Sequence, residues 1–184
     1  MKNLIVAFLA IFISSMAFSQ VQIYTKYSED GTFEPDINVF GYGPKFGEKK
    51  NFKITYFVLA ERAWAEGLMG INYAPKDWIE FGISFGVEQN PKLFRLASNI
   101  WMGNEKWSFF TWVEKGFGAD NYWYNSSLSY SINKNLEVGI VAWRFNGVGT
   151  KIKTKFDKIS IWIFPAYDLE FQKKNITVGV DIKI

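Results

Sequence analysis

The sequence contains no cysteine and no histidine. Without cysteine the chain can form no disulfide, can carry no lipid on a mature N-terminal cysteine and has no thiolate nucleophile. Without histidine it has no Ser-His-acid triad, no histidine metal ligand and no histidine proton relay. We therefore predict that the protein is not an enzyme, and that hydrogen bonds and packing alone hold its fold together.

An excess of charge of one sign is also lacking. The chain has 21 Lys and Arg against 18 Asp and Glu, which gives a formal net charge of +3. A balance so near neutrality does not indicate a nucleic-acid partner. No nucleotide-binding loop or metal-ligand spacing is present, so no cofactor and no metal is predicted. Aromatic residues, in contrast, are abundant: they make up 19% of the chain and include eight tryptophans.

The N-terminus has the order of a secretory signal peptide. Lys2 is followed by an apolar stretch from Leu4 to Ile13, and small residues follow near Ala17 and Ser19. The apolar stretch is too short to span a bilayer as a helix. Residues 1–19 are therefore predicted to be a cleaved signal peptide, and residues 20–184 to form one domain.

From Val21 onward the hydrophobic pattern has a period of two, and no helical periodicity is long enough for a helix. The clearest strand runs from Trp78 to Glu88. Lys158 to Phe171 and the C-terminal segment alternate in the same way, and Pro165 predicts a bulge or bend in the former. The mature chain is therefore predicted to be all-β.

Eleven clusters of turn residues separate the segments and imply twelve strands, with ten as the alternative count. Their spacing of about 14 residues fits strands of about 9–11 residues joined by tight turns, the length that crosses a membrane at a tilt. We therefore predict a single closed, antiparallel, up-and-down barrel with short turns. The predicted turns lie at 30–31, 47–49, 61–62, 74–77, 90–91, 103–104, 118–120, 133–135, 146–147, 157 and 173–175.

Two features bear on which barrel face meets lipid. A closed barrel of twelve strands with an apolar lining would leave a void, which favours a polar interior and an apolar exterior. Many aromatic residues also fall near strand ends, where membrane barrels carry aromatic girdles. These residues are Trp64, Tyr73, Trp78, Trp101, Trp107 and Tyr122.

Residues 21–184, which end on the apolar Ile184, resemble the Gram-negative outer-membrane β-barrel (porin-like) proteins. That class typically ends on an aromatic residue, so Ile184 departs from its pattern. The resemblance implies a transmembrane barrel in the outer membrane, contact with outer-membrane lipid and recognition of the last strand by the barrel-assembly machinery. The phospholipases and lipid A acylation enzymes of this fold type depend on a histidine beside a serine, which this sequence lacks.

The turn positions predict a charged row inside the barrel. They place Glu66 opposite Gly86, Gly86 opposite Arg95 and Arg95 opposite Glu114, with Glu88 diagonal to Arg95. Gly86 would leave room for Glu66 to reach Arg95. The cluster of Glu66, Glu88, Arg95 and Glu114 is interpreted either as an ion network that braces the barrel or as a charged constriction that filters solutes.

Two further sets of residues share the inner face. Lys151, Lys153 and Lys155 form a basic row, with acidic neighbours predicted at Glu137, Asp168, Glu170 and Asp181. Large aromatic side chains are also predicted to occupy the lumen, which indicates a narrow or closed pore. These are Phe110, Trp112, Trp123, Trp143, Trp162 and Phe164.

Three functions remain open from the sequence. The leading hypothesis is a narrow passive channel or small-solute conduit in the outer membrane. The second is a non-conducting structural or assembly barrel. The third is a soluble periplasmic barrel that binds an apolar ligand, and it requires Ile79, Phe81, Ile83 and Phe85 to be buried in the interior.

Overall fold

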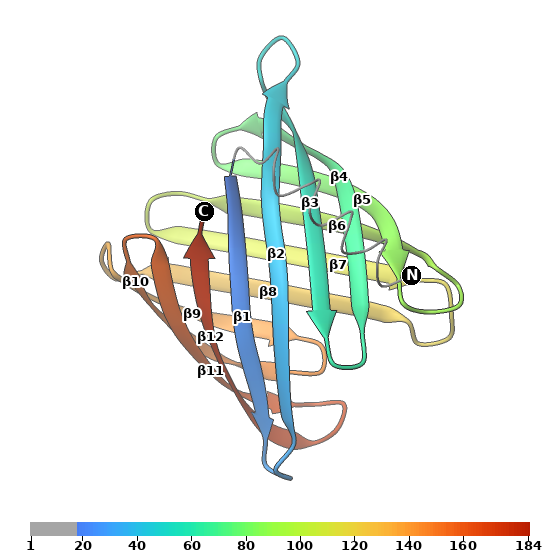
Figure 1. The fold of residues 1–184 in the computed structure, drawn as a ribbon. Helices are drawn as coiled ribbons and strands as arrows, with labels where there is room; N and C mark the ends of the chain where they lie inside the picture. Colours follow the sequence, from blue (N-terminus) through green and yellow to red (C-terminus); the bar gives the residue numbers. More distant parts are fainter. Residues whose placement is uncertain (1–17) are drawn as a thin grey trace.

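The computed structural model describes residues 18–184, which form a single sheet of twelve antiparallel strands (Figure 1). Successive strands are hydrogen-bonded neighbours throughout. The strands are β1 (Phe18–Ser28), β2 (Phe33–Phe46), β3 (Phe52–Glu61), β4 (Ala65–Lys76), β5 (Ile79–Glu88), β6 (Phe94–Gly103), β7 (Trp107–Gly116), β8 (Tyr122–Ser131), β9 (Leu136–Trp143), β10 (Gly147–Phe156), β11 (Ile159–Asp168) and β12 (Lys173–Lys183).

The sheet closes because β1 pairs with β12 along nearly its whole length, from Gln20 opposite Lys183 to Ser28 opposite Asn175. This confirms the predicted closed up-and-down barrel and the count of twelve. At the end of the seam the amide of Ile184 donates to the carbonyl oxygen of Ser19 at 2.9 Å. Most of the predicted signal peptide, residues 1–17, lies outside the described residues. Within residues 18–184, no helix is long and apolar enough to cross a membrane.

The apolar residues of the alternating strands point outward. On β5, Ile83 is 72% exposed and Phe85 52% exposed, whereas Ser84 and Glu88 on the opposite face are buried. Strands β11 and β12 repeat this pattern. The exposed Ile83 and Phe85 contradict the hypothesis of a soluble barrel with an apolar lining.

The turns agree with the predictions at most positions but differ at two. β4 continues to Lys76, so residues 74–76 belong to a strand and not to a turn. β12 begins at Lys173, so the last turn lies at 169–172 and not at 173–175. The predicted bulge at Pro165 is also wrong, because the register with β10 is the same on both sides of this residue. Pro165 lies on the exposed outer face.

The predicted lumen aromatics do lie on the inner face, in two buried clusters. In the first, Tyr24 of β1 contacts Trp143 of β9, with ring centroids 5.1 Å apart. In the second, Trp112 of β7 lies 5.5 Å from Phe57 of β3. These pairs join strands that are not neighbours in the sheet, so aromatic side chains cross the lumen.

The predicted aromatic girdle is only partly correct. Tyr73, Trp78, Trp107 and Tyr122 are exposed. Trp64 instead donates its indole N–H to Glu66 inside the barrel, and Trp101 lies opposite the inner residue Glu80. The position of a residue in the alternation along its strand determines whether its side chain faces outward or inward. Proximity to a strand end does not indicate which face the side chain occupies.

Candidate functional site

The structure brings the four residues of the predicted charged cluster together, one from each of β4, β5, β6 and β7. The Nε of Arg95 lies 2.5 Å from Glu114 Oε2 and 3.1 Å from Glu66 Oε2, and its Nη1 lies 2.7 Å from Glu88 Oε2. All four side chains are buried. One guanidinium thus faces three carboxylates within the barrel wall.

Two steps of the predicted register are nevertheless wrong. Glu66 lies opposite Glu88 rather than Gly86, and Arg95 lies opposite Gly116 rather than Glu114. The first error has two causes. The register is irregular between Tyr73 and Lys76, and the turn lies further along the chain than predicted, so β4 is shifted against β5. The pairing of Gly86 with Arg95 is as predicted, and so is the diagonal position of Glu88 relative to Arg95.

Several partners of the cluster were missed. Asn121, in the β7–β8 turn, accepts from Arg95 Nη1 at 2.8 Å and donates to Glu88 Oε1 at 2.6 Å. The indole of Trp112 donates to Glu114 Oε1 at 2.6 Å. Trp112 and Glu114 lie two residues apart in β7, which places both side chains on one strand face, so this signal was present in the sequence. Trp64 has the same spacing to Glu66 but lies in the β3–β4 turn. Asn121 carried no such signal, because it lies in a turn.

Gly116 makes room for this network. A Cβ at this position would lie 2.2 Å from Asn121 Nδ2 and 2.6 Å from Glu88 Oε2. We expect Gly116→Ala to lower the free energy of unfolding by about 1–3 kcal/mol, because the added methyl group displaces a well-packed polar network. Urea titration of the refolded protein measures this change. Gly118→Ala is the control, since its Cβ would meet only Asn121 Cβ at 3.6 Å, and an equal effect of the two would contradict the role given to Gly116.

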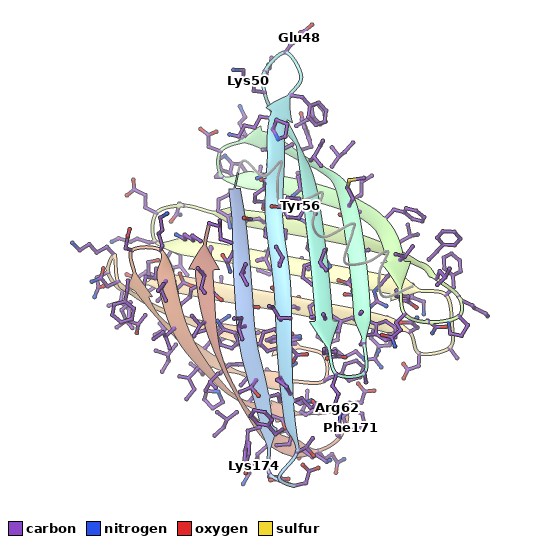
Figure 2. The ribbon with its side chains drawn as sticks, in the orientation of Figure 1. Glu48, Lys50, Tyr56, Arg62, Phe171 and Lys174 are labelled. Carbon is purple, nitrogen blue, oxygen red and sulfur yellow. The ribbon has the colours of Figure 1, made fainter. Side chains whose placement is uncertain are left out.

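A cavity of about 580 Å³ opens next to this cluster, at one end of the barrel. It is bounded by five turns, those of β1–β2, β3–β4, β7–β8, β9–β10 and β11–β12, and it shares Tyr24, Trp123 and Trp143 with the aromatic core. Figure 2 labels Arg62 and Phe171 at this end and Glu48 at the opposite end. The cavity is therefore a vestibule at the turn-lined mouth of the lumen.

Arg144, in the β9–β10 turn, forms part of the vestibule wall. Its Nη2 lies 3.0 Å from Asp120 Oδ1 and 3.1 Å from Glu170 Oε1, and its guanidinium lies over the ring of Tyr122 at 3.7 Å. Desolvation opposes the charge on this guanidinium, but Glu170, Tyr122 and Asp120 outweigh it and raise the pKa of Arg144. Arg144 thus remains charged, and its charge is offset by neighbouring carboxylates.

The predicted basic row is mostly neutralised. Lys153 pairs with Asp181 at 2.6 Å and Lys155 pairs with Glu137 at 2.6 Å. Both carboxylates were among the predicted acidic neighbours of the row. Lys151 lies over the ring of Trp162 at 3.9 Å. Glu170 does not join this row, because it pairs with Arg144 at the vestibule, and Asp168 accepts hydrogen bonds from the amides of the β11–β12 turn.

A second polar network, which the sequence pattern did not reveal, lies on the inner faces of β2 to β5. Lys53 Nζ is 2.6 Å from Glu80 Oε2 and lies over the ring of Tyr42 at 3.4 Å. Asn72 donates to the same carboxylate, to Oε1, at 2.5 Å. Among residues 18–184, no group of three or more acidic, histidine or cysteine side chains could hold a metal ion.

Comparisons with solved structures identify barrels of similar shape. The KdgM porin in complex with disordered oligogalacturonate matches with a TM-score of 0.66 at 12% identity, covering 89% of this chain and 98% of that chain. The NanC porin matches with a TM-score of 0.53 at 9% identity, covering 89% of this chain and all of that chain. The chain shares the fold of these outer-membrane porins. No family model matches the sequence, and no curated protein does.

The same fold also occurs in an enzyme. The outer membrane phospholipase of Salmonella typhi, solved as a dimer with bound calcium, matches with a TM-score of 0.57 at 12% identity, covering 89% of this chain and 90% of that chain. At such identities the likeness concerns the fold alone. The residues of the lumen and vestibule must therefore decide the function.

Proposed function

We propose that this protein is an exported outer-membrane β-barrel that forms a narrow conduit for small solutes. The observation that carries the proposal is a closed barrel with an apolar outer face and charged side chains on its inner face. At one end the barrel opens into the vestibule of about 580 Å³. In a bilayer every backbone polar group must be paired, and only a closed sheet satisfies this with strands. The fold similarity to porins supports the same assignment.

The route of export follows from the N-terminal pattern and the last strand. We propose that residues 1–19 direct secretion and are removed before Gln20, so that most of β1 remains to pair with β12. The apolar outer face of β12, the last strand of the barrel, would be presented to the barrel-assembly machinery. Outer-membrane lipid would then surround the exposed apolar side chains.

Two layers of side chains narrow the proposed conduit. The Arg95 cluster lies beside the vestibule and supplies the charge. Next to it, Trp112 meets Phe40 and Phe57 from the opposite wall, at centroid distances of 6.1 and 5.5 Å. We propose that the charged layer selects among solutes and that the aromatic layer limits their size.

Planar-bilayer conductance of the refolded protein tests this function. We expect small discrete current steps from the wild type, and steps several-fold larger from a Phe40→Ala/Phe57→Ala variant, because both partners of Trp112 across the lumen are removed. Glu88→Gln should lower the preference for cations, because it removes one carboxylate from the charged layer. Leu169→Ala, on an exposed turn, is the control and should leave the current steps unchanged.

Absence of current from bilayers that contain the folded protein would contradict the proposed conduit. If wild type and the double variant both fold, as shown by heat-modifiable migration in electrophoresis, yet pass no current, the conduit is rejected. The aromatic contacts across the lumen favour a specific second candidate in that case. The protein would be a non-conducting barrel whose filled lumen stiffens a membrane scaffold.

A further inference from the structure

One wall of the vestibule carries an acidic pair that lacks a basic partner. Asp36 of β2 lies directly opposite Glu61 of β3, and both line the cavity. Like charges directly opposite each other on one sheet face destabilise it. Neither residue has an ion pair within residues 18–184.

Asp36 is the more constrained of the two. Its side chain is 8% exposed, and its Oδ1 is fully buried without a hydrogen-bond partner. A buried carboxylate oxygen without a partner loses its hydration and gains nothing in return. Glu61 remains exposed at the cavity wall, so a ligand that entered the vestibule would reach the pair from its side.

The basic residues of the vestibule are already engaged, with one exception. Lys26 pairs with Glu34, Arg95 with three glutamates, and Arg144 with Asp120 and Glu170. Only Arg62, in the β3–β4 turn, lines the cavity without an ion pair among the described residues. Counting these partners, eight acidic side chains meet four basic ones, so acidic groups outnumber basic groups in the vestibule.

Aromatic side chains lie next to the acidic pair. Tyr24 of β1 lies directly opposite Asp36, and its ring packs against Trp143. Both residues line the cavity. Carboxylates beside aromatic faces are the surroundings that bind an ammonium or guanidinium group, through charge-assisted hydrogen bonds and cation–π contacts.

We infer that the Asp36–Glu61 pair is a binding site for small organic cations, compounds with a primary ammonium or a guanidinium group. The cationic group would bridge the two carboxylates, and the body of the molecule would lie against Tyr24 and Trp143. If the barrel is the proposed conduit, small organic cations are the class of solute that it transports, and this part of the inference rests on the proposed function. Binding itself is a separate property and is measured separately.

The test is isothermal titration of agmatine, which carries one guanidinium and one ammonium group, into the detergent-refolded full chain at low salt. We expect wild type to bind agmatine and not the anionic sugar glucuronate. Asp36→Asn and Glu61→Gln should each weaken agmatine binding about tenfold or more, because each removes one of the two carboxyl groups that hold the cation. Both substitutions keep the shape of the side chain.

Two control variants test whether the change in agmatine binding depends on negative charge and on its position at the vestibule. Glu48→Gln removes the same charge from the β2–β3 turn at the opposite end of the barrel (Figure 2), and agmatine binding should not change. Arg62→Ala removes the free positive charge beside the pair, and binding should tighten several-fold. All variants are first checked for folding by heat-modifiable migration in electrophoresis. Because the Glu61 side chain is exposed, Glu61→Gln is not expected to affect folding.

Three results would overturn the inference. They are absence of agmatine binding to folded wild type, tighter binding of glucuronate than of agmatine, and equal effects of Glu61→Gln and Glu48→Gln. Conductance distinguishes this failure from that of the proposed function. A sealed barrel that binds agmatine rejects the conduit and keeps the site, whereas a conducting barrel that does not bind agmatine does the reverse.

Discussion

Replacing Arg95 by alanine should lower the free energy of unfolding by about 3–5 kcal/mol, because it leaves an uncompensated set of buried charges. Glu66, Glu88 and Glu114 would face one another with no cation between them. Asn121 would also lose one of its two hydrogen-bond partners in the cluster. Urea titration of the protein refolded into lipid vesicles measures the loss.

A second variant separates charge from packing in this experiment. Adding Glu114→Gln and Glu66→Gln to the Arg95→Ala variant removes two of the opposing carboxylates, and we expect part of the stability to return. Arg62→Ala, which removes an exposed arginine with no ion pair among the described residues, should change stability by less than about 0.5 kcal/mol. Equal stability of Arg95→Ala and wild type would show that the cluster does not brace the barrel.

The second large effect concerns the outer face. Ile83→Lys should cost about 2–4 kcal/mol in lipid vesicles, because it places a charge in the middle of a strand that the proposal exposes to the bilayer core. Ile83 is 72% exposed and lies midway along β5. The free energy of unfolding in vesicles of a single phospholipid measures this cost.

Depth in the membrane provides the control. Leu169 is 70% exposed, almost the same as Ile83, but it lies in the β11–β12 turn at the barrel end. Leu169→Lys should therefore cost only about 0–1 kcal/mol, the value for a charge near the interface. If both lysine variants were equally stable in lipid, the outer face would not lie in a bilayer core.

The sequence predicted the faces of the strands better than their register. A period of two assigns each side chain to one face, and that assignment survives any register error of two residues. This is why Glu66, Arg95 and Glu114 were correctly placed together although the predicted pairings of Glu66 with Gly86 and of Arg95 with Glu114 were wrong. An error of one residue would have separated them.

Residues in turns and beside register irregularities could not be predicted in the same way. Asn121 reaches Arg95 because of the path of the β7–β8 turn, and period-two reasoning does not describe that path. Asp36 and Glu61 were not predicted to pair, because the register of β2 against β3 contains an irregularity after Tyr42 that the turn positions do not reveal. The ionic partners of the lysine row followed the predicted parity only where both partners lay within strands.

The contents of the lumen also determine how the barrel is sealed at β1 and β12. Besides the backbone ladder, Gln22 of β1 donates to Asp181 of β12 at 2.7 Å, and Tyr24 packs against Trp143 and Trp162. Parting these two strands would therefore expose aromatic surface as well as break hydrogen bonds. In the proposed conduit, a solute would therefore move along the barrel axis rather than leave sideways between β1 and β12.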